Sequence, residues 1–129
     1  MRNDAFDIGQ VWSFQNRPGE NDATITILDI EEVKDAAIIH VRIDGVKIFS
    51  PGAEGGYTSF IGHLPFSENA IARSVTKFLG QIAALPDYSD GYNQWKQAFD
   101  NGRAGYWKMD VAEVIERIDN MAQEKNNFM

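Results

Sequence analysis

The spacing of apolar residues changes near Pro65. Before this point apolar and polar side chains mostly alternate, as they do along β-strands that bury one face. After it, apolar side chains recur three or four positions apart, as on one face of an α-helix. This change predicts an α+β fold in which a curved antiparallel sheet from the first half of the chain is covered by about three helices from the second half.

Alternation and turn residues locate the strands. Trp12 and Phe14 share one face of the first run, and in a later run the apolar phase slips between Ile27 and Leu28, which indicates a β-bulge. Asp44 and Gly45 form a dipeptide typical of two-residue hairpin turns, whereas the Gly-rich segment 50–60 is expected to be a surface loop. The predicted strands are residues 10–14, 23–33, 36–43, 46–49 and 60–64, with a short late strand at 104–109.

Capping residues and apolar stripes locate the helices. Ser67 is suited to cap a helix whose stripe continues to Ile82. Asp110 and Glu113 match the capping-box pattern that opens a last helix. The sequence predicts helices at 67–84, 89–101 and 110–122, within one domain of residues 1–129 that has a flexible tail from about residue 122.

Composition excludes several kinds of chemistry. The chain has 129 residues, no cysteine and two histidines, so thiol catalysis, disulfides and Cys-ligated zinc are excluded. Its formal charge of -7 disfavours nucleic acid, whose affinity for proteins comes mainly from Lys and Arg on phosphates. We expect no cofactor and no metal. The polar N-terminus and the absence of a long apolar run predict a cytoplasmic protein with no membrane partner.

Tyrosines and aspartates cluster in the segment that opens the second predicted helix. Tyr88 and Tyr92 alternate there with Asp87 and Asp90. Tyrosine supplies large contact area with a polar end, and carboxylates select cations. The main hypothesis is therefore a protein-interaction module whose acidic, aromatic-bearing surface engages a basic partner, as an inhibitor or immunity-type protein would. Homo-oligomerisation through the aromatic surface is a further alternative.

Arg17 and Glu20 flank a Pro-Gly turn and present opposite charges. One interpretation places them in the same partner-binding set. The other is an ordinary connection with one local ion pair, which contributes little on an exposed surface.

His40 and His63 are the only imidazoles, so any acid-base or metal chemistry must use them. As an alternative function, a small-molecule-binding domain or small enzyme would combine them with Glu54 and Tyr57 of the 50–60 segment. We favour a structural interpretation, in which His40 lies on a partly exposed sheet face beside Arg42 and the two rings do not meet carboxylates in a common cleft. No catalytic motif is present, which favours a binding module over an enzyme.

Four short segments carry a resemblance: Gly-Gln-Val-Trp-Ser-Phe at 9–14, Arg-Pro-Gly-Glu at 17–20, Ile-Gly-His-Leu-Pro at 61–65 and Gly-Tyr-Asn-Gln-Trp at 91–95. With these the chain resembles a group of small bacterial proteins of unknown function over nearly its whole length. The resemblance implies no activity, ligand or catalytic residue. The Val-Trp-Ser-Phe strand also resembles the first strand of small SH3-like barrels, which implies a partial barrel.

Overall fold

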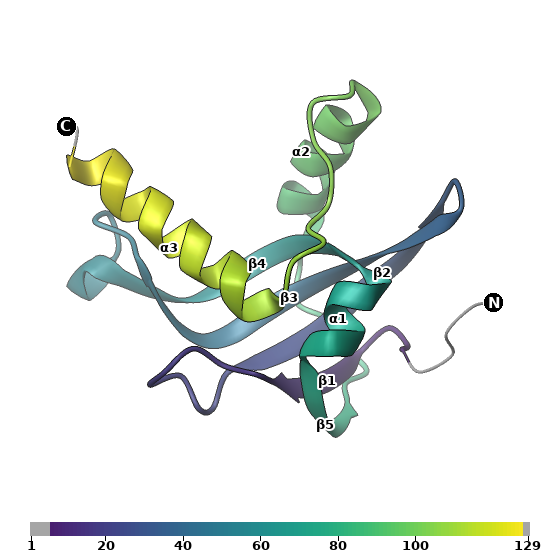
Figure 1. The fold of residues 1–129 in the computed structure, drawn as a ribbon, viewed down its shortest axis with the longest axis horizontal. Helices are drawn as coiled ribbons and strands as arrows, with labels where there is room; N and C mark the ends of the chain where they lie inside the picture. Colours follow the sequence, from purple (N-terminus) through teal and green to yellow (C-terminus); the bar gives the residue numbers. More distant parts are fainter. Residues whose placement is uncertain (1–5, 128–129) are drawn as a thin grey trace.

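The structure is a computed structural model that describes residues 6–127, with side chains through residue 125. One antiparallel sheet has the strand order β4-β3-β2-β1-β5, and three α-helices pack around it (Figure 1). The elements are β1 (Gln10–Phe14), β2 (Thr24–Val33), β3 (Ala36–Phe49), the 3-10 helix η1 (Glu54–Gly56), β4 (Tyr57–Ser67), α1 (Glu68–Ser74), β5 (Val75–Gln81), α2 (Ser89–Asp100) and α3 (Val111–Asn127). The α+β prediction is confirmed. Because β4 and β5 lie at opposite edges, the sheet is open and the SH3-like barrel is not confirmed.

The strand β5 differs most from the prediction. Apolar spacing predicts one helix over residues 67–84, but the helix ends at Ser74 and the chain continues as a strand beside β1. β1 offers an edge that needs hydrogen-bond partners, and the β-branched Val75 and Thr76 suit a strand. Phe78 pairs with Trp12 across this ladder, with ring centroids 5.4 Å apart. The predicted long helix is therefore wrong in its second half.

The hairpin turn predicted at Asp44 and Gly45 is also wrong, because β3 runs through it. Gly45 has a φ of 80°, and a Cβ at this position would lie 2.9 Å from the Cα of Ala23. The glycine thus permits a close approach of two backbones at an irregularity in the β3–β4 ladder. β4 begins at Tyr57, so the predicted 50–60 loop is shorter than expected.

The predicted late strand at 104–109 is reduced to one parallel bridge between Trp107 and Phe66. The Trp107 N–H donates to the Pro65 carbonyl at 2.9 Å, and the Ser67 N–H donates to the Trp107 carbonyl at 2.8 Å. This segment carries the chain past the β4 edge from α2 to α3 (Figure 1).

The second and third predicted helices are confirmed as α2 and α3, and α3 continues to Asn127, past its predicted end. Within residues 6 to 127, no helix combines the length and the apolar character needed to cross a bilayer.

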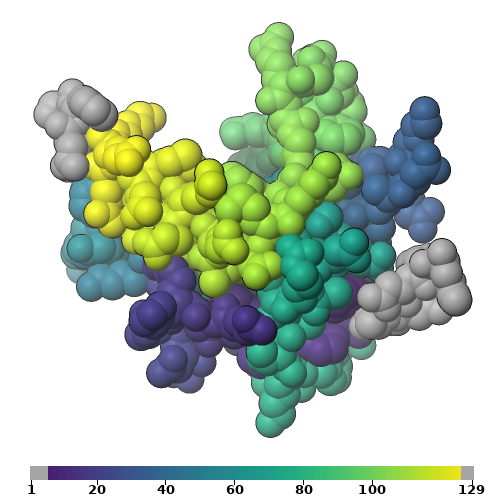
Figure 2. All heavy atoms as spheres, in the orientation of Figure 1, coloured from purple at the N-terminus to yellow at the C-terminus, as the bar shows by residue number. Residues whose placement is uncertain are grey.

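The two faces of the sheet have different coverings. Alternate residues of β3 point to one face, where they are fully buried against apolar side chains of α1 and α3. Of the intervening residues, Ile38 and His40 are also fully buried and point to the opposite face, whereas Arg42 and Asp44 are partly exposed. There α2 covers His40 with the rings of Tyr92 and Trp95. In Figure 2 the α2 segment projects as a separate lobe from the body of the molecule.

Candidate functional site

Three neighbouring strands bring together a carboxylate and both imidazoles. His40 of β3 lies beside Glu31 of β2, with Nε2 to Oε1 at 3.0 Å. Its other nitrogen, Nδ1, lies 2.8 Å from Nε2 of His63 on β4. The two rings are stacked, with centroids 5.0 Å apart and an interplanar angle of 18°. The result is a hydrogen-bonded chain from Glu31 through His40 to His63.

This geometry overturns the favoured interpretation of the histidines. His40 is 0% exposed rather than partly exposed, and its partners are His63 and Glu31 rather than solvent beside Arg42. The imidazoles therefore do converge with a carboxylate. Residue scarcity suggested the pair, but only the registers of β2, β3 and β4 place the three side chains on one face.

Helix α2 covers the Glu31–His40–His63 hydrogen-bonded chain with residues that are spaced three or four positions apart on one helix face. The Tyr92 hydroxyl donates to Glu31 Oε1 at 3.0 Å, and Lys96 Nζ donates to Oε2 at 2.9 Å. The Trp95 ring packs edge-on against His40, with centroids 4.9 Å apart. Partial burial raises the pKa of Glu31, but the hydrogen bonds from Lys96, Tyr92 and His40 outweigh burial, so the pKa lies below its ordinary value.

Both imidazoles are neutral at pH 7. Burial lowers the pKa of His40 and outweighs the opposing effect of its bond to Glu31. Burial, together with the neighbouring His40, lowers the pKa of His63 to about 4. Neutral rings each carry one N–H donor and one bare acceptor nitrogen.

His63 also lines a surface hollow of about 280 Å³ at the start of α2. Gly91 sits directly over its side chain, because a Cβ at Gly91 would lie 3.1 Å from the His63 Cβ. Asp87 accepts hydrogen bonds from the Ser89 N–H and hydroxyl at the helix start. Gly62, His63, Asp87, Tyr88, Asp90 and Gly91 line this hollow, which we name the His63 hollow.

The His63 hollow contains three of the six predicted partner-binding residues. Asp87, Tyr88 and Asp90 line it, and neither aspartate forms an ion pair with any residue from 6 to 125. Tyr92 lies one turn further along α2, with its ring 6.3 Å from that of Tyr88. Asp87, Tyr88 and Asp90 therefore share one hollow, and Tyr92 lies next to it.

Arg17 and Glu20 lie elsewhere and have internal partners. Arg17 makes a bidentate ion pair with Glu20, at 2.8 and 2.6 Å, and a bond of 3.2 Å to Asp119 of α3. Their side chains are only 11% and 9% exposed. Glu20 also accepts from the Lys47 N–H, and Asp119 accepts from the Phe49 N–H. This network ties the turn to β3 and α3, so we leave the two residues out of the candidate site.

The other two residues of the alternative set are separate from the histidines. Glu54 lies in η1, and Tyr57 packs against Phe49 with Lys47 over its ring. Tyr57 is six positions before His63 on β4, which corresponds to about 20 Å along a strand. The structure does not bring the 50–60 segment to the imidazoles. The residues that the sequence analysis missed, Glu31 and Lys96, have no local signal, because their role depends on strand register and helix placement.

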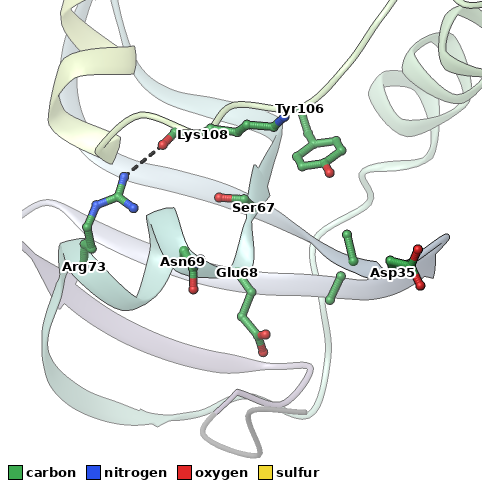
Figure 3. Close-up of a pocket in the computed structure, with 9 residues that line it drawn as sticks. Asp35, Ser67, Glu68, Asn69, Arg73, Tyr106 and Lys108 are labelled. Carbon is green, nitrogen blue, oxygen red and sulfur yellow. Dashed lines mark hydrogen bonds between the residues drawn. The ribbon is translucent and has the colours of Figure 1, made fainter. Parts of the chain in front are cut away.

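A second hollow, of about 380 Å³, lies between the β2–β3 hairpin and α1 (Figure 3). Two of its polar side chains, Arg73 and Ser67, have internal hydrogen-bond partners. Arg73 donates to Asp110 and to the Lys108 carbonyl, both at 2.9 Å, and the Ser67 hydroxyl caps α1. Its unlike charges, such as Glu68 and Lys108, indicate no single ligand chemistry.

No group of three or more His, Cys, Asp or Glu side chains in the described part of the chain is arranged to hold a metal ion. Comparison with protein-family models, with curated proteins and with solved structures found no match. The site is therefore interpreted from its own chemistry.

Proposed function

We propose that this protein is an interaction module that binds a basic side chain of a partner protein in the His63 hollow. The observation that carries the proposal is the gathering of Asp87 and Asp90, both without an ion pair among the described residues, around a concave surface beside Tyr88 and His63. Two carboxylates without a cation attract one from a partner. An inhibitor or immunity-type protein would engage a basic target in this way.

The surroundings of the hollow support the same proposal. The formal charge of -7 would accelerate encounter with a basic protein at low salt. Tyr88 and Tyr92 add aromatic area next to the carboxylates, and Tyr is enriched at the centres of protein interfaces. Asp87 and Tyr88 come directly before α2 and Asp90 lies in its first turn, so all three lie at the helix start that lines the hollow.

The test is a titration of the ¹⁵N-labelled protein with an acetyl-Gly-Arg-Gly-amide peptide. Its matched control is the same peptide with citrulline, which keeps the shape of arginine but not the charge. We expect amide shifts confined to residues 62–63 and 87–92, weaker at high salt because exposed charges are screened. Citrulline should produce much smaller shifts.

Substitutions test whether the peptide binds to the carboxylates of Asp87 and Asp90. Asp87→Asn with Asp90→Asn should abolish the shifts, whereas Asp22→Asn, at an exposed position outside the hollow, should leave them unchanged. Equal responses to arginine and citrulline, or a response that survives the double substitution, would contradict the proposal.

A small-molecule-binding domain or small enzyme at the same hollow is a second candidate. The Glu31–His40–His63 chain favours it, because an imidazole oriented by a carboxylate is an arrangement that general-base catalysis uses. A thermal-shift screen with small amines and amides tests this candidate. A rise in melting temperature with such compounds, together with no response to the arginine peptide, would favour it over the interaction module.

A further inference from the structure

The hydrogen bonds to Glu31 determine which nitrogen of His40 carries its proton. The Glu31 carboxylate has three donors around it: the Tyr92 hydroxyl, Lys96 Nζ and His40 Nε2. An ionised carboxylate only accepts hydrogen bonds. The proton of His40 therefore lies on Nε2.

The same reasoning gives the tautomer of the second ring, that of His63. His40 is fully buried, so it stays neutral, and with its proton on Nε2 its Nδ1 is an acceptor. The group 2.8 Å from that Nδ1 is Nε2 of His63, which must then donate. A neutral His63 with its proton on Nε2 has a bare Nδ1.

The bare nitrogen lies near a residue that lines the His63 hollow. Gly91, which lines the hollow, is the residue against the ring, and a Cβ there would lie 3.8 Å from His63 Nδ1. Nδ1 has no hydrogen-bond partner among residues 6 to 125. Glu31 itself does not line the hollow; it is connected to the hollow through the two rings and through its bonds to Tyr92 and Lys96 of α2.

We propose that Glu31 is a positioning residue for this hollow: through His40 it holds His63 in the tautomer that presents a bare Nδ1 to a ligand. This inference rests on the proposed function for its ligand and specifies that ligand further. An acceptor nitrogen beside two carboxylates selects a cation that also donates N–H groups. A guanidinium fits this description, because its planar fork carries five N–H donors.

The tautomers are measured directly by long-range ¹H–¹⁵N correlation of the imidazole rings at pH 7. In the parent protein both histidines should show a protonated Nε2 and an unprotonated Nδ1. A proton on His63 Nδ1 in the parent protein would overturn the inference, and this result needs no variant.

Glu31→Gln should move the proton of both imidazole rings from Nε2 to Nδ1. Its amide oxygen would face Lys96, which only donates, and its NH₂ would then donate to His40 Nε2. His40 would carry its proton on Nδ1 and donate to His63 Nε2, so His63 would carry a proton on Nδ1 toward the hollow. Glu113→Gln, on an exposed position of α3, is the matched control and should change neither ring. Unchanged tautomers in folded Glu31→Gln would also overturn the inference.

The arginine peptide provides a second readout. Its affinity should fall about tenfold in Glu31→Gln, the size expected for one lost hydrogen bond to a charged group. If the parent tautomers are as stated and the peptide does not bind, the positioning role is supported and the proposed function is contradicted. If peptide binds equally to parent and Glu31→Gln, the positioning role is contradicted and the proposed function is not.

Discussion

On one face of the sheet, α3 contributes Val111, Val114 and Ile115, each 0% exposed, whereas on the other face α2 contributes no buried residue. The first face is held by apolar packing, which is strong and non-directional. The second is held by aromatic contacts and by hydrogen bonds to Glu31, which are weaker and directional. The two faces therefore have different roles. The face covered by α3 stabilises the fold, and the face covered by α2 sets the orientation of polar groups.

Truncation in the apolar face should have the largest effect. Ile115→Ala should lower the free energy of unfolding by about 2 to 5 kcal/mol, because it removes buried methyl groups and leaves a cavity. Met121→Ala, on the same helix but 53% exposed, should change it by less than about 0.5 kcal/mol. Urea denaturation measures both. Similar losses for the two variants would contradict this account of the apolar face.

Removal of the Glu31 carboxylate should have a smaller, local effect. Glu31→Ala leaves Tyr92, Lys96 and His40 without their acceptor and should cost about 1 to 3 kcal/mol. Hydrogen exchange should then increase in α2 and remain slow in α3. Glu124→Ala, at an exposed position, is the control. Equal acceleration in both helices would show that the two faces are not energetically separate.

Acid should destabilise the face covered by α2, because it protonates His63. Its pKa in the folded protein is about 4, below the ordinary value near 6.5 that the unfolded chain has, so the unfolded chain binds the proton first. The contribution of the neutral ring is complete above pH 6.5 and is lost progressively as the pH falls from 6.5 to 4. Denaturation across this range should show the loss in the parent and a smaller one in His63→Gln. An identical pH dependence of the unfolding free energy in the two proteins would contradict the role of His63.

Gly91→Ala should have the smallest net effect on stability, because two contributions oppose each other. Alanine favours the helix by about 1 kcal/mol over glycine. The added Cβ would lie 3.1 Å from the His63 Cβ and would displace the ring. We expect a net change within about 1 kcal/mol together with shifted His63 resonances, whereas Gly105→Ala, which has no neighbour within 4 Å of a new Cβ, should leave those resonances in place. Unchanged His63 resonances in Gly91→Ala would show that α2 does not lie against the ring.

Much of the apolar face follows from local pattern. The alternation around Ile39, Val41 and Ile43 predicts the buried side of β3, and the spacing of Val111, Val114 and Ile115 predicts the buried side of α3. The prediction of a helix over the second half of 67–84 is wrong, because these residues pair with the edge of β1 instead. No local sequence pattern shows that such an edge is free to pair.

The candidate site was predicted only in part. Asp87, Tyr88 and Asp90 are close in sequence, so a local cluster was visible and corresponds to the surface of the hollow. Glu31, which orders the histidines, lies nine residues before His40 on the neighbouring strand, so its contact with the ring depends on the register of the β2–β3 ladder.

By itself, the sequence determined which residues alternate, which recur at helical spacing and which are scarce, because these properties depend on neighbours within a few positions. Tertiary structure alone decided that Glu31, His40 and His63 share one face beneath α2. That arrangement depends on the registers of two ladders, and both are shifted near the site: β2–β3 between Ile27 and Asp29, and β3–β4 between Val41 and Ile43. A slip of one residue in either ladder would turn a side chain to the opposite face and break the chain of hydrogen bonds.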